Sequence, residues 1–300
     1  MKKFVLMLLL LCCLWEPVYA ADYEELTAVG RAVGIRLQES GITVTGFTET
    51  GNAEHCGLKT GDRIVRINGS AVQTAEEIGK LTASGKPVTV TVERNGAEAE
   101  YLVQPVQTSG RWVLGLRVRD SISGIGTVTF YDRESGAYGA LGHGVCAVGS
   151  KKLMNLSGGE LVDTTVTGSE RGKRGAAGQL LGEFDPLTRL GTVCENTDQG
   201  IFGIMRAGQT LGSTYPVASA GEIRTGDAVI LSNVSGQEVR QYDVRILKLY
   251  PGEAQRNLLL EVTDPELLRQ TGGIVQGMSG SPIIQDGKLV GAVTHVCVNL

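Results

Sequence analysis

Short apolar runs separated by glycines are the feature of this sequence that most limits its possible folds. The 300 residues include 42 glycines, and the apolar runs between them mostly alternate with polar residues. Such alternation is typical of strands with one buried face, and glycine allows the tight turns that join them. No alternation of strands with long helices is visible, which disfavours a doubly wound sheet. The pattern predicts a mainly β protein built as a barrel or sandwich.

Residues 32–106 are predicted to form a compact α+β unit. Two Asn-Gly pairs, at Asn68 and Asn95, indicate tight turns. Thr74 and Glu77 form a capping-box pattern that predicts the start of a helix. Alternating patterns predict strands at residues 33–37, 42–47, 63–67, 88–93 and 98–103.

Residues 56–69 (Cys-Gly-Leu-Lys-Thr-Gly-Asp-Arg-Ile-Val-Arg-Ile-Asn-Gly) resemble the signature of bacterial PDZ domains. The resemblance implies a domain that binds an extended peptide as an added strand and takes a C-terminal carboxylate on backbone N–H groups. We predict that Val33, Gly34 and Ile35 bind the peptide, because glycine lets the backbone approach a carboxylate. The alternative is that Gly34 is an ordinary glycine at a strand edge.

The N-terminus has the pattern of an export signal. Lys2 and Lys3 precede an apolar run at 4–14, which is short for a membrane span, and Ala20 offers a cleavage site. Residues 1–20 are therefore predicted to be a signal peptide or, alternatively, an uncleaved membrane anchor. Either reading places the bulk of the chain outside the cytoplasm.

The next segment and the cysteines carry weaker signals. Residues 21–31 are predicted to be a linker with a short helix at 22–31. Lipid attachment at Cys12 is disfavoured because the preceding Leu11 is bulky. The four cysteines after the leader show no C-x-x-C pair, which argues against a zinc site. They allow three disulfide pairings, or they are free and buried; they are Cys56, Cys146, Cys194 and Cys297.

Residues 107–300 are predicted to form a second, larger β domain. One short helix is expected at 265–270, and a turn at 286–287 separates the last two apolar runs. The net charge of −4 and the absence of a basic stripe exclude a nucleic-acid-binding pattern. Further strands are expected near 112–118, 124–131, 139–143, 161–167, 201–205, 228–232, 239–249 and 257–262.

Ser279 is the candidate nucleophile, within residues 277–282 (Gly-Met-Ser-Gly-Ser-Pro). Glycines on both sides let the N–H groups of Gly277 and Ser279 point at one oxyanion, and each such donor is worth roughly 3–4 kcal/mol. The run resembles that of trypsin-like peptidases and differs from the G-x-S-x-G elbow of esterases. Ser281 is the rival nucleophile, and a plain turn between strands is the alternative interpretation.

A serine nucleophile needs a base, and the chain has three histidines. His143 follows a predicted strand between two glycines and is the first candidate. His295 is the second, and His55 is expected on the surface of the PDZ-like unit.

Asp264, 15 residues before Ser279, is the candidate acid that would orient the base. The alternative is that it caps the helix at 265–270, since it precedes a proline at the first helical position. Other candidate acids are Asp163, Asp185 and Asp198.

Residues 111–299 resemble the sporulation stage IV B peptidases, a serine-peptidase family of spore-forming Firmicutes. The similarity lies in segments 123–143, 271–282 and 287–296. It implies a trypsin-like double β-barrel that needs no metal or cofactor, with Ser279 as nucleophile, His143 as base and Asp264 as acid. The chain ends where similar proteins continue with another strand and a helix, so we expect either that the second barrel lacks a strand or that the sequence is incomplete.

The resemblance also implies a place and partners. Such proteins are exported into the space between the two forespore membranes. There they cleave themselves and a membrane-bound inhibitor of an intramembrane metalloprotease, which then activates a late sigma factor. The PDZ unit would bind a segment of the target or of a second copy. The rival hypothesis is a non-catalytic PDZ adaptor with a degraded peptidase domain.

Overall fold

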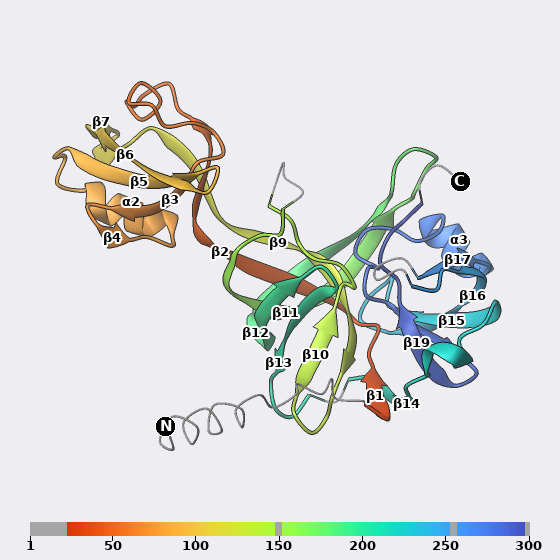
Figure 1. Cartoon of the computed structure of the whole chain (residues 1–300). Coiled ribbons are helices and arrows are strands. Elements are labelled where there is room, and N and C mark those ends of the chain that lie inside the picture. The colour runs from red at the N-terminus through yellow and green to blue at the C-terminus, as the bar shows by residue number, and fades with distance from the viewer. Residues whose placement is uncertain (1–22, 148–151, 210, 253–256, 298–300) are drawn as a thin grey trace, which may run out of the picture.

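The computed structural model describes residues 23–147, 152–209, 211–252 and 257–297, so the predicted leader lies outside the described residues. Within these ranges no helix has both the length and the apolar character needed to cross a bilayer. The predicted fold class is confirmed: the chain is mainly β, with a PDZ-type unit in front of a larger β domain (Figure 1).

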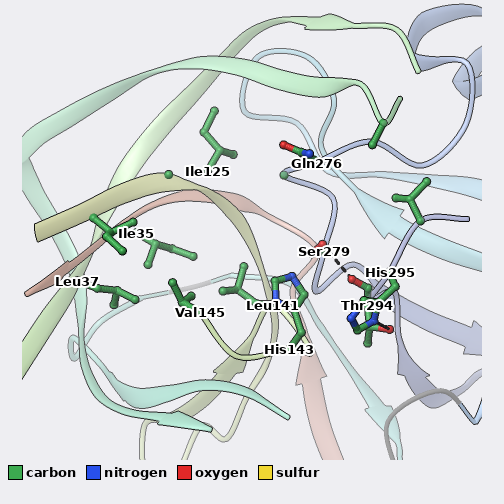
Figure 2. Close-up of a pocket in the computed structure, with 15 residues that line it drawn as sticks. Ile35, Leu37, Ile125, Leu141, His143, Val145, Gln276, Ser279, Thr294 and His295 are labelled. Carbon is green, nitrogen blue, oxygen red and sulfur yellow. Dashed lines mark hydrogen bonds between the residues drawn. The ribbon is translucent and has the colours of Figure 1, made fainter. Parts of the chain in front are cut away.

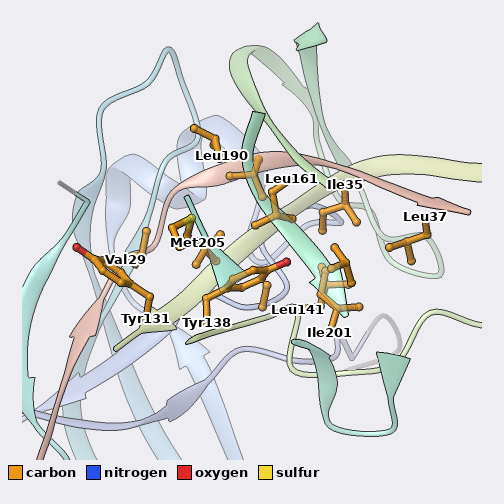
Figure 3. Packing of buried hydrophobic residues seen from close by; sticks show 14 of the residues in the cluster. Val29, Ile35, Leu37, Tyr131, Tyr138, Leu141, Leu161, Leu190, Ile201 and Met205 are labelled. Carbon is orange, nitrogen blue, oxygen red and sulfur yellow. The ribbon is translucent and has the colours of Figure 1, made fainter. Parts of the chain in front are cut away.

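The first half of the larger domain is a closed antiparallel barrel. Its six strands are β2 (Ala32–Phe47), β9 (Leu116–Tyr131), β10 (Ala137–Ala140), β11 (Leu156–Glu170), β12 (Gln179–Thr197) and β13 (Gly200–Met205). They follow the order β9-β10-β13-β12-β11-β2, and pairing of β2 with β9 closes the ring. Tyr138, Leu161 and Ile201 are fully buried in its interior (Figure 3).

The segment before the barrel corrects the predicted helix at 22–31. Residues Glu25–Ala28 form strand β1, which pairs with β9 and with β14 (Ser213–Pro216). Leu26 and Ala28 are buried against the second half of the domain. Pairing with distant strands therefore overrides the local helical pattern.

The second half of the larger domain is a five-stranded antiparallel sheet. Its core contains Ile230, Val244, Leu267 and Met278, all fully buried. In the described part of the chain, the two outer strands of this sheet do not pair with each other, and a cavity of about 510 Å3 lies between them. The strand order is β17 (Leu258–Val262), β16 (Arg240–Leu249), β15 (Gly226–Ser232), β18 (Pro282–Gln285) and β19 (Lys288–Ala292), with helix α3 (Pro265–Thr271) and the 3-10 turn η2 (Ala220–Glu222) beside it.

The PDZ-type unit forms as its local signals predict. Thr74 Oγ1 accepts from the N–H of Glu77 at 3.3 Å, and the Glu77 carboxylate accepts from the N–H of Thr74 at 3.1 Å, so the capping box is present. The carboxylate of Asp62 is buried and holds the Arg94 guanidinium through two bonds of 2.6 and 2.7 Å. The elements are β3 (Arg63–Ile67), β4 (Ser70–Ala71), α2 (Ala75–Thr82), β5 (Val88–Arg94), β6 (Ala97–Val103), β7 (Val106–Thr108) and β8 (Arg111–Val113).

Strands β2 and β9 run through both units, as Figure 1 shows. Residues 32–38 of β2 pair with 121–127 of β9 in the barrel, while residues 43–47 of β2 pair with 116–119 of β9 in the PDZ-type unit. Residue 32, where the PDZ-like unit was predicted to begin, is the first residue of strand β2, whose first part belongs to the barrel. The two units share a continuous two-stranded ribbon.

The turn η2 is tied to β19 by Glu222, whose charge should make the stability depend on pH. The ion pair with Lys288 and the hydrogen bonds from Ser219 lower the pKa of Glu222 from its usual 4.5 to about 2. Because the pKa is lower in the folded state, the ionised group stabilises the fold above about pH 4.5, and this contribution is lost as the pH falls toward 2. We expect the stability difference between the wild type and Glu222→Gln, measured by urea denaturation, to shrink across this window. A difference that stays constant with pH would contradict the assignment.

Candidate active site

Ser279 lies in a loop held between the two halves of the larger domain. Its carbonyl accepts from the N–H of Thr127 in β9 at 3.0 Å, and the Thr127 hydroxyl donates to the carbonyl of Gly277 at 2.7 Å. On the other side, the N–H of Gly280 donates to the carbonyl of Val293 at 2.7 Å. Two β structures therefore fix the backbone on both sides of Ser279.

Two N–H groups of this loop are available to a ligand. Among the described residues, the N–H groups of Gly277 and Ser279 have no acceptor. Those of Gln276, Met278 and Gly280 each donate to a backbone carbonyl. The alternation leaves two donors, one on each side of Met278, as an oxyanion site for acyl transfer requires.

His143 lies across the same cavity from Ser279 (Figure 2). It follows β10 after two residues with positive φ, Leu141 at 71° and Gly142 at 67°, which turn the chain out of the barrel. Asn196 of β12 fixes the next turn by bonding both the N–H and the carbonyl of Val145 at 2.8 Å. The cavity has a volume of about 470 Å3, and its apolar wall consists of Ile35, Leu37, Ile122, Ile125, Leu141 and Val145.

The hydrogen bond of the His143 imidazole is compatible with a role as general base. Its Nδ1 lies 3.0 Å from the carbonyl of Gly144, and a bond to this acceptor places the imidazole proton on Nδ1. Nε2 is then the nitrogen able to accept a proton. A backbone carbonyl here selects the tautomer, which is the task of the acid in a catalytic triad.

Ser279 does not bond to His143 in this conformation. Its Oγ donates to the carbonyl of Thr294 at 3.2 Å, and within the described residues no hydrogen bond joins it to an imidazole. His295 also borders the cavity, with its ring centroid 5.6 Å from that of His143. Transfer of the Ser279 proton to His143 requires the hydroxyl to rotate away from Thr294, and such loose catalytic contacts are common without substrate.

Asp264 is not brought to this cavity. Its carboxylate accepts from the N–H of Leu267 at 2.8 Å and from the N–H of Asp243 at 3.4 Å, so it caps α3. The alternative cap interpretation therefore describes its position. The residues that line the cavity do not include it.

The cap gives a prediction that separates structure from catalysis. Asn caps helices about as well as Asp, whereas Ala at such a position costs roughly 1 kcal/mol. We expect Asp264→Asn to leave the thermal midpoint unchanged and to keep the peptidase rate within about threefold of the wild type. Asp264→Ala should lower the midpoint. A loss of rate above a hundredfold in Asp264→Asn at unchanged midpoint would instead show a catalytic role for the carboxylate.

The structure corrects the predicted peptide-binding segment. Val33, Gly34 and Ile35 are not in a loop: they lie in β2, paired with β9 on one side, and Gly34 and Ile35 also pair with β11 on the other. A Cβ on Gly34 would come within 2.6 Å of the Val162 side chain. Gly34 is therefore required by packing in the barrel wall and leaves no room for a peptide.

The other candidate residues lie in positions with no sign of a catalytic role. Ser281 is buried and donates to Ser232, which removes it as a nucleophile. Asp163 pairs with Arg31 at 2.6 Å. Asp185 caps its own turn, Asp198 is exposed, and His55 is exposed in the PDZ-type unit. The four cysteines of the described chain are unpaired, and Cys146, Cys194 and Cys297 are exposed rather than buried.

Sequence reasoning missed three residues that shape the site. Thr127 anchors the Ser279 loop, Gly144 contacts the His143 imidazole, and Thr294 accepts from the Ser279 hydroxyl. Gly144 and Thr294 act through backbone carbonyls, which cannot be predicted from the type of residue. Of the three, only Thr127 acts through its side chain, which is visible in the sequence.

Comparisons with known proteins assign parts of the chain to two sequence families. The sequence model of the SpoIVB peptidase S55 family matches residues 110–300, and that of a PDZ domain matches residues 43–94. A stretch of 92 residues, 30% of the chain, is 36% identical to a candidate zinc metalloprotease of Agrobacterium fabrum. The chain covers 23% of that protein's length.

Proposed function

The chain belongs to the SpoIVB peptidase S55 family and is a PDZ-containing peptidase, and from this premise we propose that it is a serine endopeptidase with Ser279 as nucleophile. The observation that carries the proposal is the shared cavity: Ser279 and His143 border it, and two unpaired N–H groups flank the serine. No second function is favoured by an observation of this kind.

The residues support a two-step acyl transfer. His143 Nε2 takes the proton of Ser279 Oγ as this oxygen bonds to the scissile carbonyl carbon. The N–H groups of Gly277 and Ser279 bind the resulting oxyanion. The imidazolium then gives its proton to the leaving amine as the C–N bond breaks. Water, deprotonated by the same imidazole, hydrolyses the acyl-enzyme and restores Ser279.

We extend the proposal to place and partners. The family match and the leader pattern of residues 1–20 support an exported, extracytoplasmic peptidase of the space between forespore membranes. Its substrates would be its own chain and a membrane-bound regulatory protein, whose cleavage frees an intramembrane protease to activate a late sigma factor. The PDZ unit would select the target segment or a second copy.

The nucleophile is tested by labelling with a fluorophosphonate, which reacts with activated serines. The chain without residues 1–20 should be labelled and should cleave itself, and Ser279→Ala should lose both. Ser281→Ala, two residues further along, is the matched control and should keep both. Equal labelling and processing of the wild type and Ser279→Ala would overturn the assignment and favour a non-catalytic PDZ adaptor.

A further inference from the structure

Strand β9 has one edge that carries no partner strand near the active site. Its other edge pairs with β2 from Leu116 to Thr127. Beyond residue 127, the edge opposite to β2 pairs with β10. Across the described residues no strand pairs with this edge between Leu116 and Ile125. We call residues 116–125 the open edge of β9.

The open edge begins at the nucleophile loop. The N–H of Thr127 donates to the carbonyl of Ser279 at 3.0 Å, and the carbonyl of Thr127 accepts from the N–H of Leu141 at 3.2 Å. Pairing of 121–127 with β2 is regular, so backbone groups alternate between the edges. Ile125, Ser123 and Ser121 therefore direct their N–H and carbonyl groups to the same side as Thr127.

The open edge ends in the PDZ-type unit. Residues 116–119 pair with β2 beside β3, and Asp120 accepts from the first N–H of helix α2 at 3.0 Å. Nine residue steps separate Leu116 from Ile125. At about 3.3 Å per residue, the edge spans roughly 30 Å.

We propose that the open edge of β9 binds the substrate segment that follows the scissile bond, as an added antiparallel strand. The inference rests on the proposed function. Unpaired strand edges are templates for an extended chain, and this one joins the Ser279 cavity directly to the peptide-binding unit. An occupant that reaches both places is the polypeptide being cut.

The direction of the bound chain follows from its two ends. A PDZ domain receives the C-terminal part of its ligand. The substrate then runs from the cavity at Ile125 toward Leu116, opposite to β9. The apolar wall of the cavity formed by Leu37, Ile122 and Val145 would receive an apolar side chain just after the cleaved bond. The length of the open edge therefore sets the length of substrate that it can bind, and efficient cleavage requires about nine residues downstream of the bond.

The experiment removes one N–H from the open edge. Ser123→Pro lacks the donor, while the pair that Ser123 forms with Arg36 uses the groups of neighbouring residues. Ser123→Ala keeps the donor and is the matched control. The probe is a library of long peptides with free C-terminal carboxylates, made by partial lysyl-endopeptidase digestion of a bacterial proteome, with cleaved bonds mapped by mass spectrometry.

We expect the wild type and Ser123→Ala to cut bonds with about nine or more downstream residues at least tenfold faster than bonds near a C-terminus. Ser123→Pro should lose this preference while its fluorophosphonate labelling and thermal midpoint stay unchanged. If Ser123→Pro does not fold, Ser121→Pro interrupts the same edge farther from the cavity.

Two results would overturn the inference. One is a wild type that cuts without regard to downstream length, or that cuts no long peptide although Ser279 is labelled. The other is a folded proline variant that retains the length preference. Failure of the proposed function is separate, because it would appear as absent labelling of Ser279 in the wild type.

Discussion

Replacing His143 by alanine is expected to lower kcat at least about 10³-fold, because the Ser279 hydroxyl then has no base positioned for its proton. The Gly144 carbonyl at 3.0 Å from His143 Nδ1 favours the tautomer in which Nε2 can accept a proton. Initial rates on an unfolded protein substrate, with fluorophosphonate labelling in parallel, measure the effect. Both readouts should fall together.

His295→Ala is the matched control for this prediction. His295 borders the same cavity, but its Nδ1 lies 2.9 Å from the Thr294 hydroxyl and its side chain is exposed. We expect its loss to cost less than about tenfold, since it does not supply the base. A larger loss in His295→Ala than in His143→Ala would exchange the two roles.

The PDZ-type unit could be predicted in detail because its signals are local. The capping box at Thr74 and Glu77 and the two Asn-Gly turns involve residues within a few positions of each other. Each appears in the structure as expected, with Asn68 and Asn95 at positive φ. Backbone preferences of this kind do not depend on the rest of the fold.

Predictions failed where distant strands decide the structure. Strand β12 was missed because its outer part is exposed, contains Pro186 and shows no apolar alternation. It forms through pairing with β11 and β13. The sequence assigns Gly34 to peptide binding because the PDZ-like signature that follows suggests that residues 32–47 belong to that unit alone. Only the closure of the barrel by β9 and β11 reveals its position.

At the site, the sequence pointed to two residues that share a cavity, but not to the backbone groups that hold them. Ser279 stood out by the glycines on both sides of it and His143 by following a predicted strand between two glycines, and the structure places both on one cavity. Asp264 has the properties of a helix cap in sequence, and it caps α3 in the structure. The Gly144 carbonyl beside His143 Nδ1 could not be predicted, because every residue carries a carbonyl and only the folded backbone orients it.

Gly280→Ala is expected to abolish activity, because the nucleophile loop packs against β9 without space for a side chain. A Cβ at this position would lie 2.1 Å from the carbonyl oxygen of Thr127 and 2.7 Å from the N–H nitrogen of Leu141. Those two atoms bond to each other and hold the turn before His143 on β9, while the N–H of the same Thr127 holds the Ser279 carbonyl. The residue also has φ +98°, which strains any residue with a Cβ.

Gly287→Ala separates the clash from the backbone strain. Gly287 has φ +75° in the turn between β18 and β19, and no atom lies within 4 Å of the point that an alanine Cβ would occupy. This variant should lose about 1 kcal/mol of stability and keep its rate. Gly280→Ala should lose fluorophosphonate labelling and cleavage together, because displacing Thr127 separates Ser279 from His143. Full labelling of a folded Gly280→Ala would mean that contact with β9 does not position the nucleophile.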